Sequence, residues 1–187
     1  DALLFGERGG LPPEGFDYGN SPVEAAYAKG RRVIFTTTTG AGRLVQAWGA
    51  AAVMMGTPMN AQAVVEAAVD AAREEDKDIV IIPAGLMEDP AFNAQEDYAA
   101  AVYLAQRLLS YAPDEAALGP NRTFYKRFTP LLMQEGLLGL FETAPHADKL
   151  RRIHKESEIP ICAQVDVTDA VPLGVARHPL GVLLRRR

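Results

Sequence analysis

Short apolar runs that alternate with longer segments of helical periodicity are the feature that most constrains this chain. Such alternation is typical of βαβ units, in which helices connect neighbouring parallel strands. We therefore predict an α/β fold, a layered and mostly parallel sheet with helices on both faces. A chain of 187 residues is long enough for one substantial core and short for two ordinary domains. We expect residues 1–187 to form a single domain.

Local composition predicts where the strands and helices lie. Continuously apolar and β-branched runs suit buried strands, which we predict at residues 2–5, 32–36, 78–83, 159–165 and 171–176. Helical periodicity predicts helices at residues 61–75, 93–110, 121–135 and 146–155. Asn60 is expected to cap the first helix, Gly136 to end the third and Pro145 to begin the fourth. A further helix is expected soon after Gly40.

Composition excludes several classes of protein. No apolar run approaches the roughly 20 residues that cross a bilayer, so we predict no membrane span. A net charge of −5 disfavours a nucleic-acid binder, and we interpret the basic end, Arg185 to Arg187, as a solvated terminus. Cys162 is the only cysteine, which rules out an intrachain disulfide. Nothing points to an oxidising compartment, and we expect a cytoplasmic protein.

Residues 6–22 form a segment rich in glycine and proline that follows the first predicted strand. In open α/β sheets, ligands bind beyond the carboxyl ends of the strands, so a site is expected here. Glu7 and Asp17 offer the oxygen ligands that magnesium prefers, and Arg8 could bind a phosphate or sulfonate with its planar guanidinium. The alternative is an ordinary turn-rich surface loop in which these side chains are merely solvated.

Four consecutive threonines, residues 36–39, follow the second predicted strand and lead into Gly40, Gly42 and Arg43. Backbone N–H groups at a helix N-terminus favour an anion, and glycine allows its close approach. The segment is neither a Walker loop nor a dinucleotide-binding fingerprint. A strand end followed by a capped helix is the alternative. Since four threonines exceed what a cap requires, we favour an anion site.

Acidic residues also follow the third predicted strand. Residues 81–85 end that strand in a turn, Glu88 and Asp89 come next, and Glu96 and Asp97 lie near a helix start. Acids are common at helix starts simply because they suit the helix dipole. Because the ends of two other predicted strands carry side chains that suit a phosphate and a metal ion, we take Glu96 and Asp97 as candidate ligands of a metal ion or water.

Residues 161–166 alternate in a way that would place Cys162, Gln164 and Asp166 on one face of a strand. We interpret Cys162 as a small buried apolar residue. A thiol phosphatase loop would need arginine where Thr168 stands. The three histidines show no zinc-protease spacing, and no G-x-S-x-G motif occurs. The sequence therefore predicts neither a zinc site nor a serine hydrolase triad.

The stretch from Gly6 to Pro22, together with the threonine run and Gly40, resembles the 2-phosphosulfolactate phosphatase family. Further elements in matching order are Asn60-Ala61, Ala84-Gly85, Glu96-Asp97, Cys162 to Asp166 and Val171-Pro172, so the resemblance spans nearly the whole chain. It implies a magnesium-dependent phosphatase that converts 2-phospho-3-sulfolactate into sulfolactate and phosphate, a step towards coenzyme M.

The sequence also departs from the family pattern. Members usually begin several dozen residues earlier, with a strand whose end carries an aspartate and an arginine, so we expect this chain to be N-terminally incomplete. Part of the metal or phosphate site would then lie outside it. Thr39 stands where the family often has asparagine, and Ala41-Gly42 replaces a pair that usually contains threonine. These differences bear on which substrate the site prefers.

The resulting hypothesis is a magnesium ion that bridges a phosphate oxygen and a water, with Arg8 and the amides after Thr39 stabilising negative charge and one carboxylate acting as base. Whether a covalent phosphoenzyme forms stays open. The candidate metal ligands are Glu7, Asp17, Glu96 and Asp166, with Asp97 as a further possibility, and the candidate catalytic residues are Glu7, Arg8, Asp17 and Asp97. The candidate residues for binding substrate or phosphate are Asn20, Ser21, Thr37, Thr38, Thr39, Gly40, Arg43 and Gln164.

Two alternative functions fit the same residues. One is a protein that binds a small phosphorylated anion without turnover. The other is a phosphatase of the same family that acts on a different phosphorylated hydroxy acid, because a sulfonate and a carboxylate present similar charge to an arginine. A homodimer is expected only because small α/β enzymes often pair.

Overall fold

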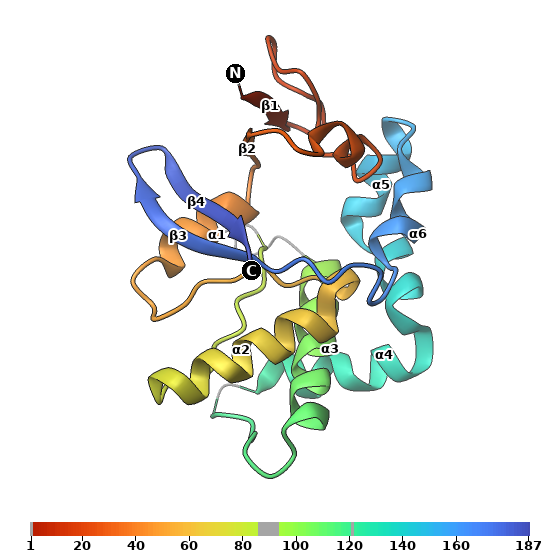
Figure 1. The fold of residues 1–187 in the computed structure, drawn as a ribbon. Helices are drawn as coiled ribbons and strands as arrows, with labels where there is room; N and C mark the ends of the chain where they lie inside the picture. The colour runs from red at the N-terminus through yellow and green to blue at the C-terminus, as the bar shows by residue number, and fades with distance from the viewer. Residues whose placement is uncertain (1, 86–93, 121) are drawn as a thin grey trace.

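The computed structural model describes residues 2–85, 94–120 and 122–187 (Figure 1). The strands are β1 (Leu3–Gly6), β2 (Val33–Thr36), β3 (Pro172–His178) and β4 (Gly181–Arg186). The α-helices are α1 (Gly40–Ala47), α2 (Ala61–Glu75), α3 (Gln95–Tyr111), α4 (Thr123–Glu142), α5 (Pro145–Arg152) and α6 (Ile159–Cys162). Short 3₁₀ helices lie at Glu24–Ala28 (η1), Pro58–Asn60 (η2) and Glu156–Glu158 (η3).

The first two strands form a parallel pair, which confirms the strands predicted at residues 2–5 and 32–36. Their register runs from Leu3 opposite Val33 to Gly6 opposite Thr36. On its other edge β1 exchanges backbone hydrogen bonds with residues 17–19. This central position of β1 fixes the loops that leave its carboxyl end and that of β2.

These residues do not form a layered, mostly parallel sheet, because the third predicted strand, residues 78–83, does not form. Residues 78–83 are irregular and pair with no strand in the part of the chain that the structure describes. Val80 is 77% exposed and Ile82 is 48% exposed, while Ile81 between them is partly buried against one of the apolar clusters. Pro83 also lacks the N–H that a sheet ladder needs. The fold is α/β with two separate two-stranded sheets.

The strand predicted at residues 159–165 is wrong, because its first half is the short helix α6 that follows η3. Pro160 stands in the first turn of that helix, where a missing N–H costs nothing, whereas in a strand it would interrupt the ladder. The predicted alternation of Cys162, Gln164 and Asp166 on one strand face is therefore wrong as well.

The strand predicted at 171–176 is confirmed as β3, and it pairs antiparallel with β4. That partner strand was not predicted. The chain end that we interpreted as a solvated terminus belongs to this hairpin: the N–H of Arg187 donates to the carbonyl of Val171 at 2.9 Å. The side chains of Arg186 and Arg187 form ion pairs with Asp169 and Asp70.

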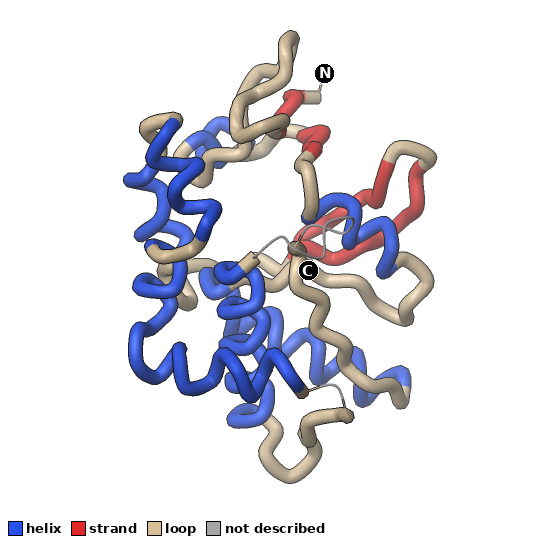
Figure 2. Tube along the Cα trace, turned by 180° about the vertical axis from the view of Figure 1, so that it is seen from behind, coloured by secondary structure: helices blue, strands red, loops and turns tan. Residues whose placement is uncertain are grey.

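Helices and the loops that connect them make up the rest of the molecule, as Figure 2 shows. α2 packs on α3 and α3 on α4, around two clusters of buried apolar residues. The predicted bounds of α2 are confirmed, and α5 begins at Pro145 as expected. Gly136 breaks α4 with a φ of 67°, but the helix resumes up to Glu142. None of the helices in the described ranges is long and apolar enough to cross a membrane.

The predicted helices at 93–110 and 121–135 are confirmed from Gln95 and Thr123, while residues 93 and 121 lie outside the described residues. Asn60 does occupy the N-cap position of α2, but its side chain does not cap the helix. Its Oδ1 accepts the N–H of Thr57 at 2.8 Å instead. The N–H of Gln62, in the first turn of α2, is satisfied by Asp166 at 2.7 Å.

Candidate active site

Glu7 connects the loops that leave the two parallel strands. It follows β1 directly and is only 5% exposed. Its Oε1 accepts the backbone N–H of Thr38 at 2.8 Å and the Thr38 hydroxyl at 2.5 Å, and its Oε2 accepts the N–H of Gly10 at 2.9 Å. Burial alone would raise the pKa of Glu7, but these hydrogen bonds and the nearby Lys149 hold that pKa below its ordinary value. Glu7 is therefore a buried, charged residue that joins the loops after the two strands. We call its three hydrogen bonds to Thr38 and Gly10 the Glu7 clasp.

Arg8 lies at the carboxyl ends of both strands. Its Nη1 donates to the carbonyl of Glu7 at 2.7 Å and its Nη2 to the hydroxyl of Thr36 at 2.9 Å. The side chain is otherwise exposed. These contacts orient the guanidinium, whose remaining N–H groups are available for an anion in the position that an open α/β sheet offers to ligands.

The threonine loop leads into α1 as predicted. Thr39 occupies the N-cap position without a side-chain cap bond, and Gly40 opens the helix. The first N–H groups of a helix have no partner inside it, so they suit an anion. Arg43, one turn on, donates from Nε to the carbonyl of Ala84 at 3.2 Å. This contact brings the segment before Gly85 to the same site although it forms no strand.

Two acids in the first turn of α3 adjoin this segment. Oδ2 of Asp97 accepts the N–H of Gly85 at 2.8 Å. Burial raises the pKa of Asp97 above its ordinary value and raises the pKa of Glu96 to about 7. Oε2 of Glu96 is buried and has no hydrogen-bond partner among the described residues. Glu88 and Asp89, the other acids noted in the sequence, lie outside the described residues.

One face of α5 covers the loop after β1, and the sequence analysis missed it. A methyl group added at Gly10 would lie 3.2 Å from Cε of Lys149 and from Cδ1 of Ile153. His146 is on the same face, three residues before Lys149. Burial lowers the pKa of His146, as does Lys149, while Asp97 and Glu7 act in the opposite direction. These influences show that His146 lies within electrostatic reach of all three charges.

The only signal in the sequence was the spacing of three between His146 and Lys149 after a helix-opening proline. Such spacing places two residues on one helix face but does not say what that face contacts. In the sequence the histidines are weighed only against zinc-ligand spacing, which does not address a helix that covers a loop from a distant part of the chain.

No hydrogen bond among the described residues joins Glu7 to the other candidates Asp17, Asn20, Ser21 and Gln164. Asp17 is exposed, and its Oδ2 accepts the N–H of Leu4 at 2.8 Å. Leu4 precedes Glu7 by three strand positions, roughly 10 Å along the chain. Ser21 is buried and its hydroxyl accepts a backbone N–H of its own turn. Asn20 and Gln164 are exposed.

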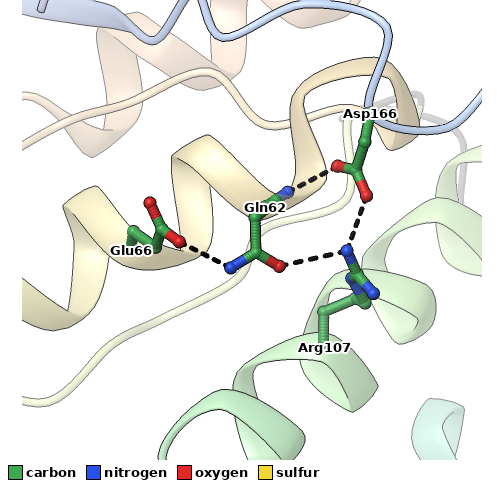
Figure 3. Close-up of polar contacts among 4 residues, drawn as sticks. All are labelled: Gln62, Glu66, Arg107 and Asp166. Carbon is green, nitrogen blue, oxygen red and sulfur yellow. Dashed lines mark hydrogen bonds and ion pairs between the residues drawn. The ribbon is translucent and has the colours of Figure 1, made fainter.

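Asp166 serves a different part of the molecule, shown in Figure 3. Its Oδ1 accepts the N–H of Gln62, and its Oδ2 accepts Nη2 of Arg107 at 2.5 Å. The Gln62 side chain accepts the same Arg107 nitrogen at 3.1 Å and donates to Glu66 at 2.6 Å. Both Asp166 oxygens are therefore used in joining its loop to α2 and α3, which leaves little capacity for a metal ion.

The predicted metal ligands Glu7, Asp17, Glu96 and Asp166 do not come together. Within the described ranges, no three or more histidine, cysteine or acidic side chains are grouped so that they could hold a metal ion. Magnesium, however, is commonly bound by one or two carboxylates together with waters and substrate phosphate oxygens. Glu96, with its unpartnered buried oxygen, and the adjacent Asp97 fit such a site.

The family model for 2-phosphosulpholactate phosphatase matches residues 1–176. The chain belongs to the 2-phosphosulfolactate phosphatase family. This confirms the resemblance noted in the sequence.

Curated relatives agree with this assignment. A protein of Deinococcus radiodurans is 35% identical over 177 residues, which cover 92% of this chain and 69% of the relative. A protein of Carboxydothermus hydrogenoformans is 31% identical over 173 residues, covering 92% of this chain and 68% of the relative. A protein of Nostoc punctiforme is 29% identical over 186 residues, which cover 97% of this chain and 72% of the relative. Each carries the name probable 2-phosphosulfolactate phosphatase.

Proposed function

We propose that this chain hydrolyses 2-phospho-3-sulfolactate to 3-sulfolactate and phosphate. Membership of the 2-phosphosulfolactate phosphatase family makes it a phosphoric monoester hydrolase, and the proposal adds the substrate that the names of its relatives give. The observation that carries the proposal is the clasp of Glu7 on Thr38. It holds Arg8, the threonine loop and the start of α1 at one sheet edge, where a phosphate can meet both amide and guanidinium donors.

Binding of the phosphate follows from these donors. The N–H groups of Gly40 and Ala41 at the start of α1 are the proposed donors to an incoming anion, and Arg8 and Arg43 supply positive charge. Donors that are oriented before the reaction stabilise the negative charge that develops on the phosphoryl oxygens. Glu7 contributes by orientation: it is charged, buried and satisfied by three hydrogen bonds, so it keeps the loops in place.

Magnesium is the proposed cofactor, with Glu96 as the residue that would hold it beside Asp97. When bound, such an ion polarises a phosphoryl oxygen and lowers the pKa of a water. Asp97 is the carboxylate that we assign as base, because burial raises its pKa above the ordinary value and so improves its match to neutral pH. A cytoplasmic location, a homodimer and a step towards coenzyme M remain predictions from the sequence.

Phosphate release tests the proposal. The protein would be assayed with 2-phospho-3-sulfolactate and with 2-phospholactate, each with magnesium and with a chelator. We expect turnover that requires magnesium and favours the sulfonate. Turnover that favours other phosphorylated acids would contradict the substrate but keep the class of enzyme. Binding of these compounds by a folded protein without any phosphate release would contradict the proposed reaction and favour a binding protein.

A further inference from the structure

Binding of the phosphate explains the roles of Arg8 and Arg43 in the candidate active site, but it does not explain the role of Lys149. Its side chain is half-buried and lies against the loop after β1, with Nζ 3.8 Å from the position of a methyl group at Gly10. Gly10 is the residue whose N–H donates to Glu7. The ammonium group therefore lies beside the Glu7 clasp, on the wall of the site formed by α5.

The other two cations of the site already donate to described residues. Arg8 donates to the Glu7 carbonyl and to Thr36, and Arg43 donates to Ala84 and Gln46. The side chain of Lys149 forms neither an ion pair nor a hydrogen bond with any residue in the described ranges. Arg8 and the start of α1 also keep free donors, but among these three cations Lys149 is the one whose side chain has no described partner at all.

Glu7 does not neutralise Lys149 directly. Both carboxylate oxygens of Glu7 accept hydrogen bonds from Thr38 and Gly10, and no Glu7–Lys149 ion pair occurs within 4.0 Å. A half-buried ammonium needs a compensating charge or water. The influence of Lys149 on the pKa of both Glu7 and His146 agrees with its position near the loop after β1.

The chemistry of the proposed substrate supplies such a charge. Besides the phosphate, 2-phospho-3-sulfolactate carries a carboxylate and a sulfonate, and each needs a donor. The phosphate is accounted for by the start of α1, Arg8 and Arg43, which come from the loops after β1 and β2. Lys149 comes from a different wall, α5, so it can reach a part of the substrate away from the phosphate.

We propose that Lys149 binds the acidic group of the substrate other than its phosphate, the carboxylate or sulfonate, and so determines specificity for phosphorylated acids. This inference rests on the proposed function. It adds a binding residue that is distant in sequence from the loops of the family resemblance.

Ligand affinity tests the proposal without requiring turnover. Calorimetric titration would measure the binding of 3-sulfolactate, of lactate and of inorganic phosphate to the wild-type protein and to Lys149→Gln. Loss of one charge-assisted hydrogen bond, about 1.5–3 kcal/mol, corresponds to roughly tenfold to a hundredfold weaker binding. We expect that loss for 3-sulfolactate, with phosphate affinity changed less than about twofold. Weaker binding of lactate by Lys149→Gln as well would identify the carboxylate as the group that Lys149 binds. Unchanged lactate affinity would identify the sulfonate.

Lys155→Gln is the matched control, because Lys155 also lies against the loop before β2, beside Gly19, but pairs with Glu158. It should leave both affinities unchanged. Lys149→Arg, which keeps the charge, should restore part of the 3-sulfolactate affinity, and thermal unfolding would show that each variant is folded.

Equal weakening of 3-sulfolactate and phosphate, no weakening of either, or no 3-sulfolactate binding by the wild type would each overturn the proposal. The proposed function fails separately. Its failure would appear as absent phosphate release from 2-phospho-3-sulfolactate by the wild-type protein while the selective effect of Lys149→Gln on 3-sulfolactate binding persists.

Discussion

Thr38 donates both its backbone N–H, at 2.8 Å, and its hydroxyl, at 2.5 Å, to one carboxylate oxygen of Glu7. The two residues are 31 positions apart in the chain, and each follows a strand of the parallel pair. Hydrogen bonds to a charged group are stronger than those between neutral groups. This contact therefore sets the relative position of the two loops that form the candidate phosphate site.

Replacing Glu7 with glutamine should destabilise the protein. The amide puts an NH₂ group where one of the two oxygens accepted an N–H, so either Thr38 or Gly10 would face a donor. We expect the free energy of unfolding to fall by about 1–3 kcal/mol, measured by urea denaturation. Glu14→Gln, on the exposed part of the same segment, should change it by less than about 0.5 kcal/mol. Similar effects of the two substitutions would argue against the clasp.

Alanine substitutions at Gly9 and Gly10 should separate backbone strain from contact with α5. Both glycines have positive φ, 67° and 89°, which costs an alanine about 1–2 kcal/mol. Alanine at Gly9 would meet no atom within 4 Å, whereas at Gly10 it would meet Lys149 and Ile153 at 3.2 Å. We expect G10A to be the less stable variant in thermal unfolding and to bind 3-sulfolactate more weakly. Equal stability and equal binding would show that α5 does not lie close to this loop.

Replacing Asp166 with asparagine should weaken the connection between its loop and the helices α2 and α3. Arg107 would lose its charged partner, and because both side chains are about a third exposed we expect a loss of only about 1–2 kcal/mol in unfolding free energy. Asp169→Asn is the control, since Asp169 is 83% exposed in its ion pair with Arg186. A D166N variant as stable as the wild type would contradict the structural role.

Stability should depend on the ionisation of Glu96. Its folded pKa of about 7 exceeds the ordinary 4.5, so the folded state holds this proton more tightly than the unfolded state. Glu96 therefore stabilises the fold at low pH, and this contribution declines as pH rises from 4.5 to about 7, by up to about 3 kcal/mol. Denaturation of the wild type and Glu96→Gln across this range would measure the decline as the difference between them.

The raised pKa of Asp97 acts in the same direction as that of Glu96, while the lowered pKa of His146 acts in the opposite one, so only the comparison with Glu96→Gln isolates Glu96. Magnesium at pH 8 should stabilise the wild type more than Glu96→Gln if Glu96 holds the ion. A difference between the two proteins that does not vary with pH, or equal stabilisation by magnesium, would contradict the assignment.

Local patterns predicted the helices better than the strands. α2 has the predicted bounds because helical period and hydrogen bonding are both local. A strand depends on a partner that composition does not specify. Residues 78–83 have strand-like composition but no described partner, and Ile159-Pro160-Ile161 forms a helix because proline suits a first turn. β4 was missed because its closing arginines were interpreted as a solvated terminus.

The site was predicted in part for a similar reason. Glu7, Arg8 and the threonine loop were found because each follows a predicted strand, and strand ends gather at one sheet edge. Asp17 was assigned from the loop that contains it and Asp166 from a strand face that does not form, and hydrogen bonds with Leu4 and Arg107 hold them elsewhere. His146 and Lys149 depend on how α5 docks on a distant loop, which no local pattern encodes.

The most direct test of the account is phosphate release from 2-phospho-3-sulfolactate, measured side by side for the wild type, Glu7→Gln and Asp166→Asn. If the site lies at the ends of β1 and β2, Glu7→Gln should lower kcat/KM by roughly a hundredfold, the effect of losing an oriented group at an active site. Asp166→Asn should retain nearly full activity in the fraction that is folded. Full activity in Glu7→Gln together with loss of activity in folded Asp166→Asn would place the reaction elsewhere and contradict the account.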